Sequence, residues 1–182
     1  MAQRRGWQVF GCEPSAGNVA LAKSKFGLNV YCSDFNCFDP QREKYDVVSF
    51  WDVLEHLVEP HVFLGKAIGM LKPEGKIVIG GPNDRSLLRV LAAFAYHMTA
   101  GRVQKPLRKA YLLEHVTYYT AATMEKLFAK HGFAMQCSFM SGTDLKKYHF
   151  PLPEKLLAST VLAAGKLLGL QNRMIAVFKA RA

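Results

Sequence analysis

The chain has 182 residues, half of them hydrophobic, which allows a substantial core and excludes an intrinsically disordered protein. Its net charge is +10, and residues 99–182 carry 13 of the 24 basic residues but only 4 of the 14 acidic ones. We expect this basic half to attract an acidic substrate, a membrane surface or a nucleic acid, or to be an ordinary lysine-rich surface.

Cysteine spacing and hydropathy narrow the class of protein further. The four cysteines lack zinc-site spacing, and no window of about twenty residues is apolar and uncharged, so we predict neither a metal site nor a membrane span. No apolar stretch typical of a signal peptide follows the first residues. Cys12 and Cys32 lie in apolar runs, which favours buried free thiols and a reducing, cytoplasmic location.

The first elements predicted are a strand, a helix and a strand. Apolar runs predict strands at 7–12 and 28–32. The helix between them is expected to begin after Ser15 and to end at Gly27. Its expected inner face consists of Ala20, Leu21 and Phe26.

The middle of the chain has the clearest strand signal, YDVVSFW at 45–51, followed by a predicted helix at 60–71 and a strand at 76–79. An apolar helix is predicted at 86–98, and the basic stretch 99–110 is expected to be a loop.

The last part of the chain is predicted to form a helix, a strand, a helix and a strand, at 120–131, 133–140, 153–168 and 174–178. Apolar strands that alternate with helices indicate an α/β fold, which we expect to be a single domain over 1–182.

Three acidic residues directly follow predicted strands: Glu13, Asp34 and Asp52. Ligands of open α/β sheets bind at the carboxyl ends of the strands, where a carboxylate accepts hydrogen bonds from a ribose diol or an adenine amino group. Each acid is alternatively a cap for the next helix. Three of them in succession favour the ligand interpretation.

Four segments in this order resemble successive blocks of the class I S-adenosylmethionine-dependent methyltransferases: VFGCEPS, DVVSFWDVLEHL, LKPEGKIVIGGPN and EHVTYYT. Over residues 7–139 the chain is similar to the group that includes ubiquinone-biosynthesis O-methyltransferases. The resemblance implies a Rossmann-like fold, with a mostly parallel sheet and helices on both faces. It also implies S-adenosylmethionine as cofactor and a small-molecule acceptor.

The same resemblance implies where the cofactor binds. In the family, an acid after the second strand holds the ribose hydroxyls, the residues after the third strand contact adenine, and the end of the fourth strand lines the pocket near the methionine end. By position in this sequence, the implied cofactor-binding residues are Glu13, Pro14, Asp34, Phe35, Trp51 and Asp52.

Two histidines are the implied candidates for catalysis. His56 matches the histidine of a Glu-His pair that borders the reacting centre, and His115 belongs to a block that faces the acceptor together with Tyr118 and Tyr119. An oxygen acceptor would need a general base, which either histidine could be. The alternative for His56 is a hydrogen bond to backbone at a helix start.

The sequence departs from the family at its start, because no Gly-x-Gly-x-Gly loop and no preceding strand occur. That loop lets the backbone approach the methionine moiety closely. We therefore interpret the chain as lacking the family's first strand, with unpaired strand edges on either side of it. The alternative to an enzyme is a non-catalytic remnant or fragment that acts as an interaction module.

Segments 84–112 and 150–170 lie where the family inserts helices that cover the acceptor. Together with the basic residues at 102, 105, 108 and 109, they suggest a lid for a lipophilic or anionic acceptor, and possible peripheral membrane contact. Ordinary helix packing is the alternative. Nucleic-acid binding would rest on net charge alone and ranks last. The sequence names neither the acceptor atom nor the oligomeric state.

Overall fold

A computed structural model describes residues 2–39, 44–111, 114–143 and 151–181. The chain divides into two compact units, Met1–Lys44 and Tyr45–Ala182. We describe each unit by itself. The expectation of a single domain stays a prediction.

Unit 1 is built from a short 3₁₀ turn, two strands and a helix: η1 (Gln3–Arg5), β1 (Phe10–Glu13), α1 (Ala16–Phe26) and β2 (Asn29–Cys32). The strands pair in parallel. Both predicted ends of α1 are confirmed. Ser15 accepts a hydrogen bond from the backbone N–H of Asn18, and Gly27 closes the helix at φ 61°, a left-handed conformation that suits glycine.

The predicted inner face of α1 is wrong. Leu21 and Phe26 are 54% and 60% exposed, and Ala20 is exposed as well. Val19 and Ala22 are the half-buried residues instead. The two-stranded sheet of unit 1 is too narrow to cover more than this stripe of the helix.

The predicted buried thiols are not found either. Cys12 is half-buried and Cys32 is exposed, and among the described residues neither forms a disulfide. Cys32 is the last residue of β2, in a sheet of only two strands, so little of the chain covers its side chain.

Unit 2 contains four strands, a 3₁₀ turn and five helices among its described residues. In chain order they are β3 (Tyr45–Trp51), η2 (Leu54–His56), α2 (Pro60–Gly69), β4 (Leu71–Pro82), α3 (Leu87–Met98), α4 (Lys105–Ala110), α5 (Ala121–Ala129), β5 (Phe133–Ser141), α6 (Leu152–Leu167) and β6 (Arg173–Ala180).

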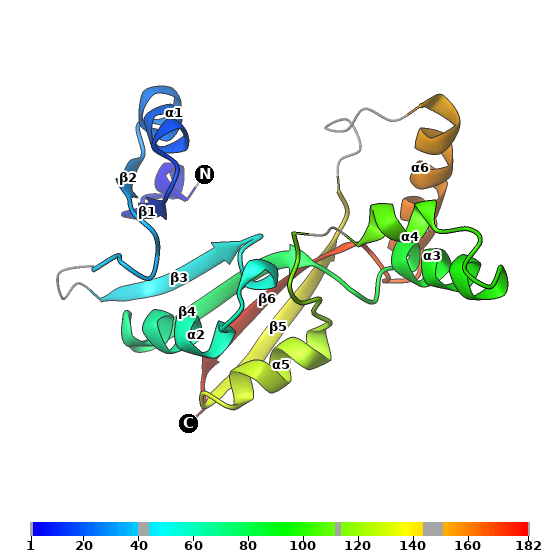
Figure 1. Cartoon of the computed structure of the whole chain (residues 1–182). Helices are drawn as coiled ribbons and strands as arrows, with labels where there is room; N and C mark the ends of the chain where they lie inside the picture. Colours follow the sequence, from blue (N-terminus) through cyan, green and yellow to red (C-terminus); the bar gives the residue numbers. More distant parts are fainter. Residues whose placement is uncertain (1, 40–43, 112–113, 144–150, 182) are drawn as a thin grey trace. The chain divides into compact units, whose positions relative to one another are not determined.

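The strands of unit 2 form one sheet in the order β3-β4-β6-β5 (Figure 1). β3 runs parallel to β4, whereas β6 lies antiparallel between β4 and β5. Three of the four strands share one direction, but β6 runs against both of its neighbours, so one strand pair is parallel and two are antiparallel. The sheet of unit 2 is therefore mixed, within the predicted α/β fold. The last strand, β6, runs in the opposite direction, which no pattern in the sequence indicated.

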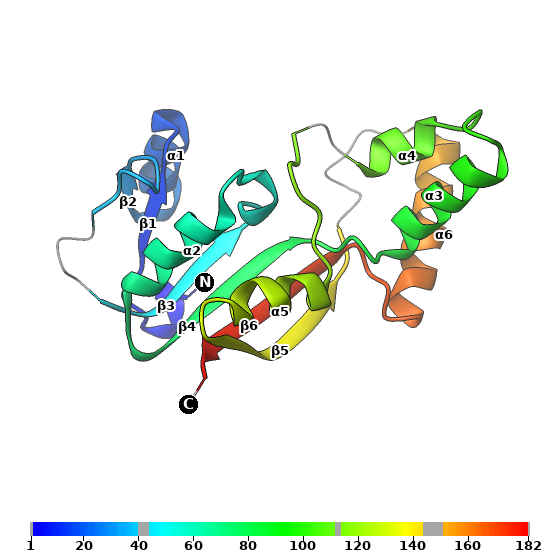
Figure 2. The same cartoon turned by 60° about the horizontal axis from the view of Figure 1, so that its bottom comes forward.

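The core of unit 2 lies between the sheet and helices α2 and α5, which cover the same face of the sheet (Figures 1 and 2). Phe128 of α5 stacks on Phe178 of β6 with ring centroids 3.7 Å apart, and both side chains are fully buried. Ile175 and Val177, on the opposite face of β6, are only half-buried. In unit 2, helices therefore cover one face of the sheet more completely than the other, whereas the resemblance implies helices on both faces.

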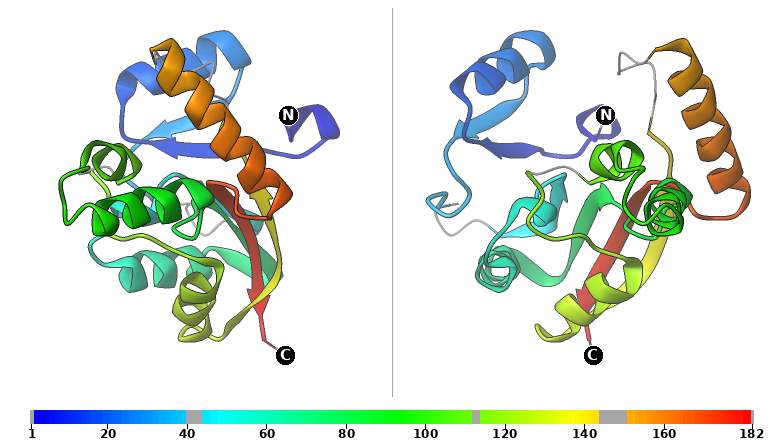
Figure 3. Two further views of the ribbon diagram at one scale, coloured as in Figure 1. Left: turned by 90° about the vertical axis from the view of Figure 1, so that its right-hand side faces the viewer. Right: turned by 45° about the vertical axis from the view of Figure 1, so that its right-hand side comes forward.

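Helices α3, α4 and α6 form a group of their own beyond the end of the sheet, with α3 packed against both other helices (Figure 3). The expected loop at 99–110 is partly wrong, because residues 105–110 form α4. Proline at the start of this segment fits the first turn of a helix. Across the described residues, the helices are too short or too polar to span a bilayer.

Candidate active site

The acidic residues of unit 1 lie at one edge of its small sheet, because β1 and β2 are parallel and their carboxyl ends coincide. Glu13 Oε1 accepts hydrogen bonds from the backbone N–H of Ser15 at 3.0 Å and from Asn18 Nδ2 at 3.1 Å. Glu13 thus caps α1, as the alternative interpretation expected, through one of its two carboxylate oxygens.

The second acid of unit 1 is engaged in a tight turn. Asp34 Oδ1 accepts from the backbone N–H of Asn36 at 2.7 Å, and the Asp34 side chain is exposed. Phe35 is half-buried and Pro14 is exposed. The four candidates of unit 1 therefore share one edge, with both carboxylates near solvent.

At the end of β3, the Trp51 side chain is 53% exposed and covers Gly80 of the neighbouring strand. A Cβ atom at position 80 would lie 2.3 Å from Trp51 Cε3, so the indole can lie here only against a glycine. The sequence did not reveal this role of Gly80.

Asp52 has a left-handed backbone, φ 53°, which is uncommon for a residue other than glycine. Its backbone N–H donates to the Gly80 carbonyl at 2.8 Å. Arg173 Nη2 donates to both carboxylate oxygens, at 2.7 and 2.8 Å. Sequence reasoning missed Arg173, which stands 121 residues away at the start of β6.

The two candidate histidines lie together. The rings of His56 and His115 have centroids 4.7 Å apart and meet edge to face at 85°. His56 Nδ1 donates to the Glu114 carbonyl at 2.9 Å, which leaves Nε2 of this exposed ring as the acceptor. Burial lowers the pKa of His115, and the neighbouring His56 lowers it further. Its imidazole is therefore biased toward the neutral form.

Glu55 lies directly beside this pair and was not singled out from the sequence, although the Glu-His dipeptide was visible. Its side chain is 2% exposed, and its Oε1 has no hydrogen-bond partner in the described part of the chain. Burial raises the pKa of the Glu55 carboxyl, and the charge of Asp52 adds to this effect. Its backbone carbonyl accepts from Val116 and Thr117, which fixes the segment carrying His115.

The side chains of Glu55, His56 and His115 could also hold a metal ion. One ligand atom from each of Glu55, His56 and His115 lies within 4.8 Å of the others. A buried carboxylate oxygen without a partner suits that role. The sequence-based prediction that the protein has no metal site therefore stays a prediction.

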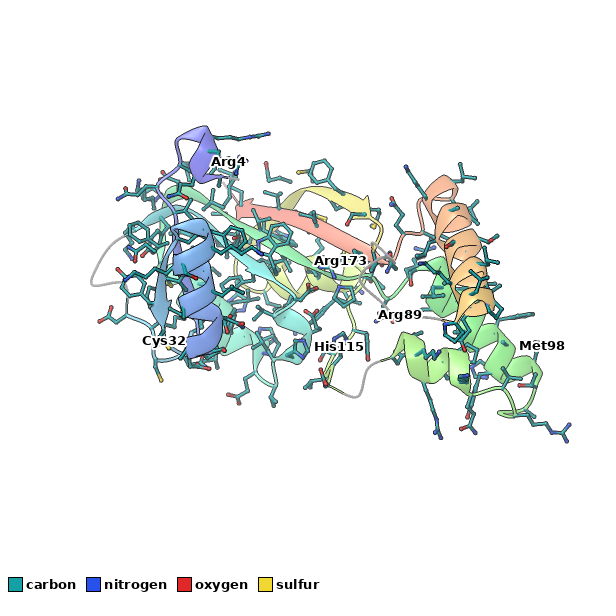
Figure 4. All side chains as sticks on the ribbon, turned by 90° about the horizontal axis from the view of Figure 1, so that it is seen from above. Arg4, Cys32, Arg89, Met98, His115 and Arg173 are labelled. Carbon is teal, nitrogen blue, oxygen red and sulfur yellow. The ribbon has the colours of Figure 1, made fainter. Side chains whose placement is uncertain are left out.

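A buried arginine supports the His115 segment from α3. Arg89 is 6% exposed, and its Nε donates to the Ala110 carbonyl at 3.1 Å. Its guanidinium lies 4.9 Å from the Tyr111 ring and 4.4 Å from the Tyr118 ring. Nothing in the apolar sequence of α3 indicated this role. Figure 4 shows Arg89 and His115 between the sheet and the group of helices.

The two tyrosines of the predicted acceptor site differ in exposure. Tyr118 is half-buried, with its ring 5.4 Å from that of His115. Tyr119 is 7% exposed, so its ring offers little surface to a ligand. Burial raises the pKa of Tyr119.

Known proteins with similar sequences include ubiquinone biosynthesis O-methyltransferases. That of Bradyrhizobium diazoefficiens is 39% identical over 85 residues, and one from Rhodopseudomonas palustris is 36% identical over 85 residues. Each match covers 44% of this chain and 33% of the relative, so the chain matches only a third of the relatives' length.

Solved structures share the fold. A SAM-dependent methyltransferase from Archaeoglobus fulgidus superposes with a TM-score of 0.61 at 15% identity, over 99% of this chain and 79% of that one. The plantazolicin methyltransferase BpumL in complex with SAH gives 0.57 at 16% identity, over 100% of this chain and 69% of that one. At sequence identities this low, the similarity shows only that the folds are alike.

A sequence profile of one family, described as a methyltransferase domain, matches residues 1–138. This match includes β1 to β4 and the segment that carries His115. The chain belongs to the methyltransferase domain family.

Proposed function

We propose that this protein transfers a methyl group from S-adenosylmethionine to a hydroxyl group of a small acceptor. The pairing of His56 with His115 beside buried Glu55 carries the proposal, because it places an oriented imidazole base next to a second imidazole and a buried carboxyl group. Family membership and the names of the relatives, which are O-methyltransferases, support an oxygen acceptor.

The edge of the small sheet fits the polar part of the cofactor. Glu13 retains a carboxylate oxygen beyond the one that caps α1, and exposed Asp34 lies at the same edge. Carboxylates so placed would accept hydrogen bonds from ribose hydroxyls and from the adenine amino group. When bound, S-adenosylmethionine supplies a methyl group that is already electrophilic, so the protein's contribution is binding, orientation and proton removal.

His56 is the proposed general base. The Glu114 carbonyl holds its Nδ1–H, so Nε2 carries the free lone pair that would accept the proton of the acceptor hydroxyl. The neutral bias of His115 keeps a second positive charge away from His56 during this transfer. Tyr118 is proposed to border the acceptor, and Trp51 and Asp52 to line the cofactor side of this site.

We further propose that α3, α4 and α6 cover the acceptor. They pack on one another, and Arg89 joins α3 to Tyr111 and Tyr118. The apolar character of α3 and α6 favours an acceptor with a hydrophobic part, such as an alkylated phenol.

Cofactor binding is tested by calorimetry with S-adenosylmethionine and S-adenosylhomocysteine on the whole chain. We expect binding that weakens by about tenfold or more in Glu13→Ala, which removes ribose hydrogen bonds. Glu125→Ala, an exposed glutamate on α5, is the matched control. A folded chain that binds neither compound would contradict the proposal and favour the non-catalytic interaction module.

Catalysis is tested with methyl-labelled cofactor and catechol or a 4-alkylcatechol. We expect His56→Gln to lower kcat by about 100-fold or more with little effect on cofactor affinity, because a general base contributes on that order. His61→Gln, at an exposed histidine on α2, provides the control outside the site. Equal kcat values for His56→Gln and the wild type would refute the assigned role.

A further inference from the structure

Two histidines outside the candidate active site lie in direct contact, and the proposed chemistry does not use them. His61 Nδ1 and His131 Nε2 are 3.0 Å apart, and the ring centroids are 5.2 Å apart. His61 is an exposed residue in the first turn of α2, and His131 is half-buried just after the end of α5. The two residues are 70 positions apart in the sequence, so only the fold brings them together.

The core of unit 2 holds the backbone that carries each ring. Helices α2 and α5 cover the same face of the sheet (Figure 2). Phe63 and Leu64, which follow His61 within one turn, are buried, and so is Phe128, three residues before His131. The backbone N–H of His131 donates to the Phe128 carbonyl at 2.9 Å. The two nitrogens therefore face each other from fixed backbone positions, while each ring can still turn about its side-chain bonds.

His131 is biased toward the neutral form that binds metal ions. Burial lowers its pKa, and the neighbouring His61 lowers it further. As the pair stands, one ring N–H lies between the two facing nitrogens. When the proton of each neutral ring lies on its outer nitrogen, both facing nitrogens carry a lone pair. This is a change of tautomer, so it needs no net loss of a proton.

We propose that His61 and His131 together bind one transition-metal ion of the Ni²⁺ or Cu²⁺ type, with water in its remaining positions. Imidazole nitrogens lie about 2.0–2.1 Å from such ions, so two of them at 90° are about 2.9 Å apart. The observed 3.0 Å fits neighbouring positions of a square-planar or octahedral ion. A tetrahedral ion such as Zn²⁺ would need about 3.3 Å. A turn of each ring points both lone pairs at the ion.

This two-histidine site is separate from the group of Glu55, His56 and His115. Metal binding between α2 and α5 requires no methyl transfer, so it stands or falls separately from the proposed reaction. The cysteine spacing that argues against a zinc site does not bear on it, because the two histidines lie on different helices.

Metal binding is tested by calorimetric titration of the whole chain, without a histidine tag, with Ni²⁺. We expect His61→Gln and His131→Gln each to weaken Ni²⁺ binding by about tenfold or more, because each removes one of two imidazole ligands. His97→Gln, at an exposed histidine on α3, is the matched control. Any ion held at the candidate active site contributes equally to all of these proteins.

The variant that lacks both histidines tests whether they hold the same ion. His61→Gln combined with His131→Gln should weaken Ni²⁺ binding by about as much as either change alone, because losing one ligand already dismantles a two-ligand site. Losses that add would assign the histidines to two separate sites and overturn the proposal.

Two other outcomes would overturn it as well. If both single variants bind Ni²⁺ as tightly as His97→Gln does, the contact is an imidazole–imidazole hydrogen bond and no metal site. If Zn²⁺ binds through the same two histidines more tightly than Ni²⁺ does, the assigned geometry of the ion is wrong.

Discussion

The Trp51 side chain determines which residues can stand at position 80, where the chain has glycine. The indole covers Gly80 so closely that a Cβ atom there would lie 2.3 Å from Cε3 and 2.6 Å from Cζ3. Gly80 is buried in β4, beside β3, where the backbone has little room to shift.

We expect Gly80→Ala to lower the free energy of unfolding by about 1–3 kcal/mol in the wild type, because the indole must move. The same substitution should cost much less in a Trp51→Ala background, where the space is empty. Urea denaturation of the four proteins measures the coupling. Gly65→Ala on α2, where nothing lies within 4 Å of an added Cβ, should be neutral or stabilising.

Ionisation of the buried Glu55 carboxyl opposes folding. Its folded pKa is raised by burial, so the protonated carboxyl suits the folded state, and stability is lost as the pH rises through that pKa. Glu55→Gln should therefore be more stable than the wild type at mildly alkaline pH. The difference should vanish near the ordinary pKa of glutamate, about 4.3.

Urea midpoints measured across this pH range, with a chelator present, check the prediction. The chelator removes any metal ion that could stabilise the ionised carboxylate. Glu125→Gln, on the exposed side of α5, should leave the midpoint close to that of the wild type at every pH. A Glu55→Gln variant that is less stable at alkaline pH would contradict the burial argument.

At the scale of elements, α3 is connected to the site by Arg89. Its guanidinium stacks on the Tyr111 and Tyr118 rings, donates to the Ala110 carbonyl and lies 3.3 Å from Asp84 Oδ1. The planar guanidinium both stacks and donates sideways, which an ammonium group does not do. Arg89 thereby holds α4 and the His115 segment against α3.

We expect Arg89→Met to lower the free energy of unfolding by about 1–3 kcal/mol, because Asp84 and the Ala110 carbonyl lose their donors. Arg89→Lys should recover only part of this loss. Hydrogen exchange at the amides of Val116 and Thr117 reports whether the His115 segment loosens as well. Arg85→Met, at an exposed arginine nearby, should change stability by less than about 0.5 kcal/mol, and an equal effect of both variants would contradict the role of Arg89.

For the whole molecule, the main structural fact is that the chain forms two compact units, each with its own sheet. The core residues buried most completely, such as Phe128 and Phe178, belong to unit 2. Unit 1 buries little of its apolar surface, since Leu21 and Phe26 remain exposed. The stability of the chain therefore resides mainly in unit 2.

We expect Phe178→Ala to lower the free energy of unfolding of unit 2 by about 3–5 kcal/mol, because a fully buried ring is removed from a stacked pair. Hydrogen exchange should show lost protection in β3 to β6 and unchanged exchange in β1 and β2. Equal loss of protection in both units would show that they unfold together. Phe139→Ala, at a 57% exposed ring on β5, is the control.

Much of the local structure follows from the sequence by itself. The strand at 45–51 has the predicted bounds, and the caps at Ser15 and Thr120 begin helices where expected. These features depend on residues a few positions apart, so a sequence pattern contains them. The ordered strand-end motifs likewise indicated the methyltransferase family. The interpretation that the family's first strand is lacking stays a prediction.

The tertiary structure alone decided how the candidate site is assembled. The sequence predicted roles for His56 and His115 separately. Their contact forms because the chain returns to η2 at Glu114, 58 residues after His56. The ion pair of Asp52 with Arg173 depends on β6 running antiparallel beside β4. The order and direction of strands determine such contacts, and hydrophobic periodicity does not encode either of them.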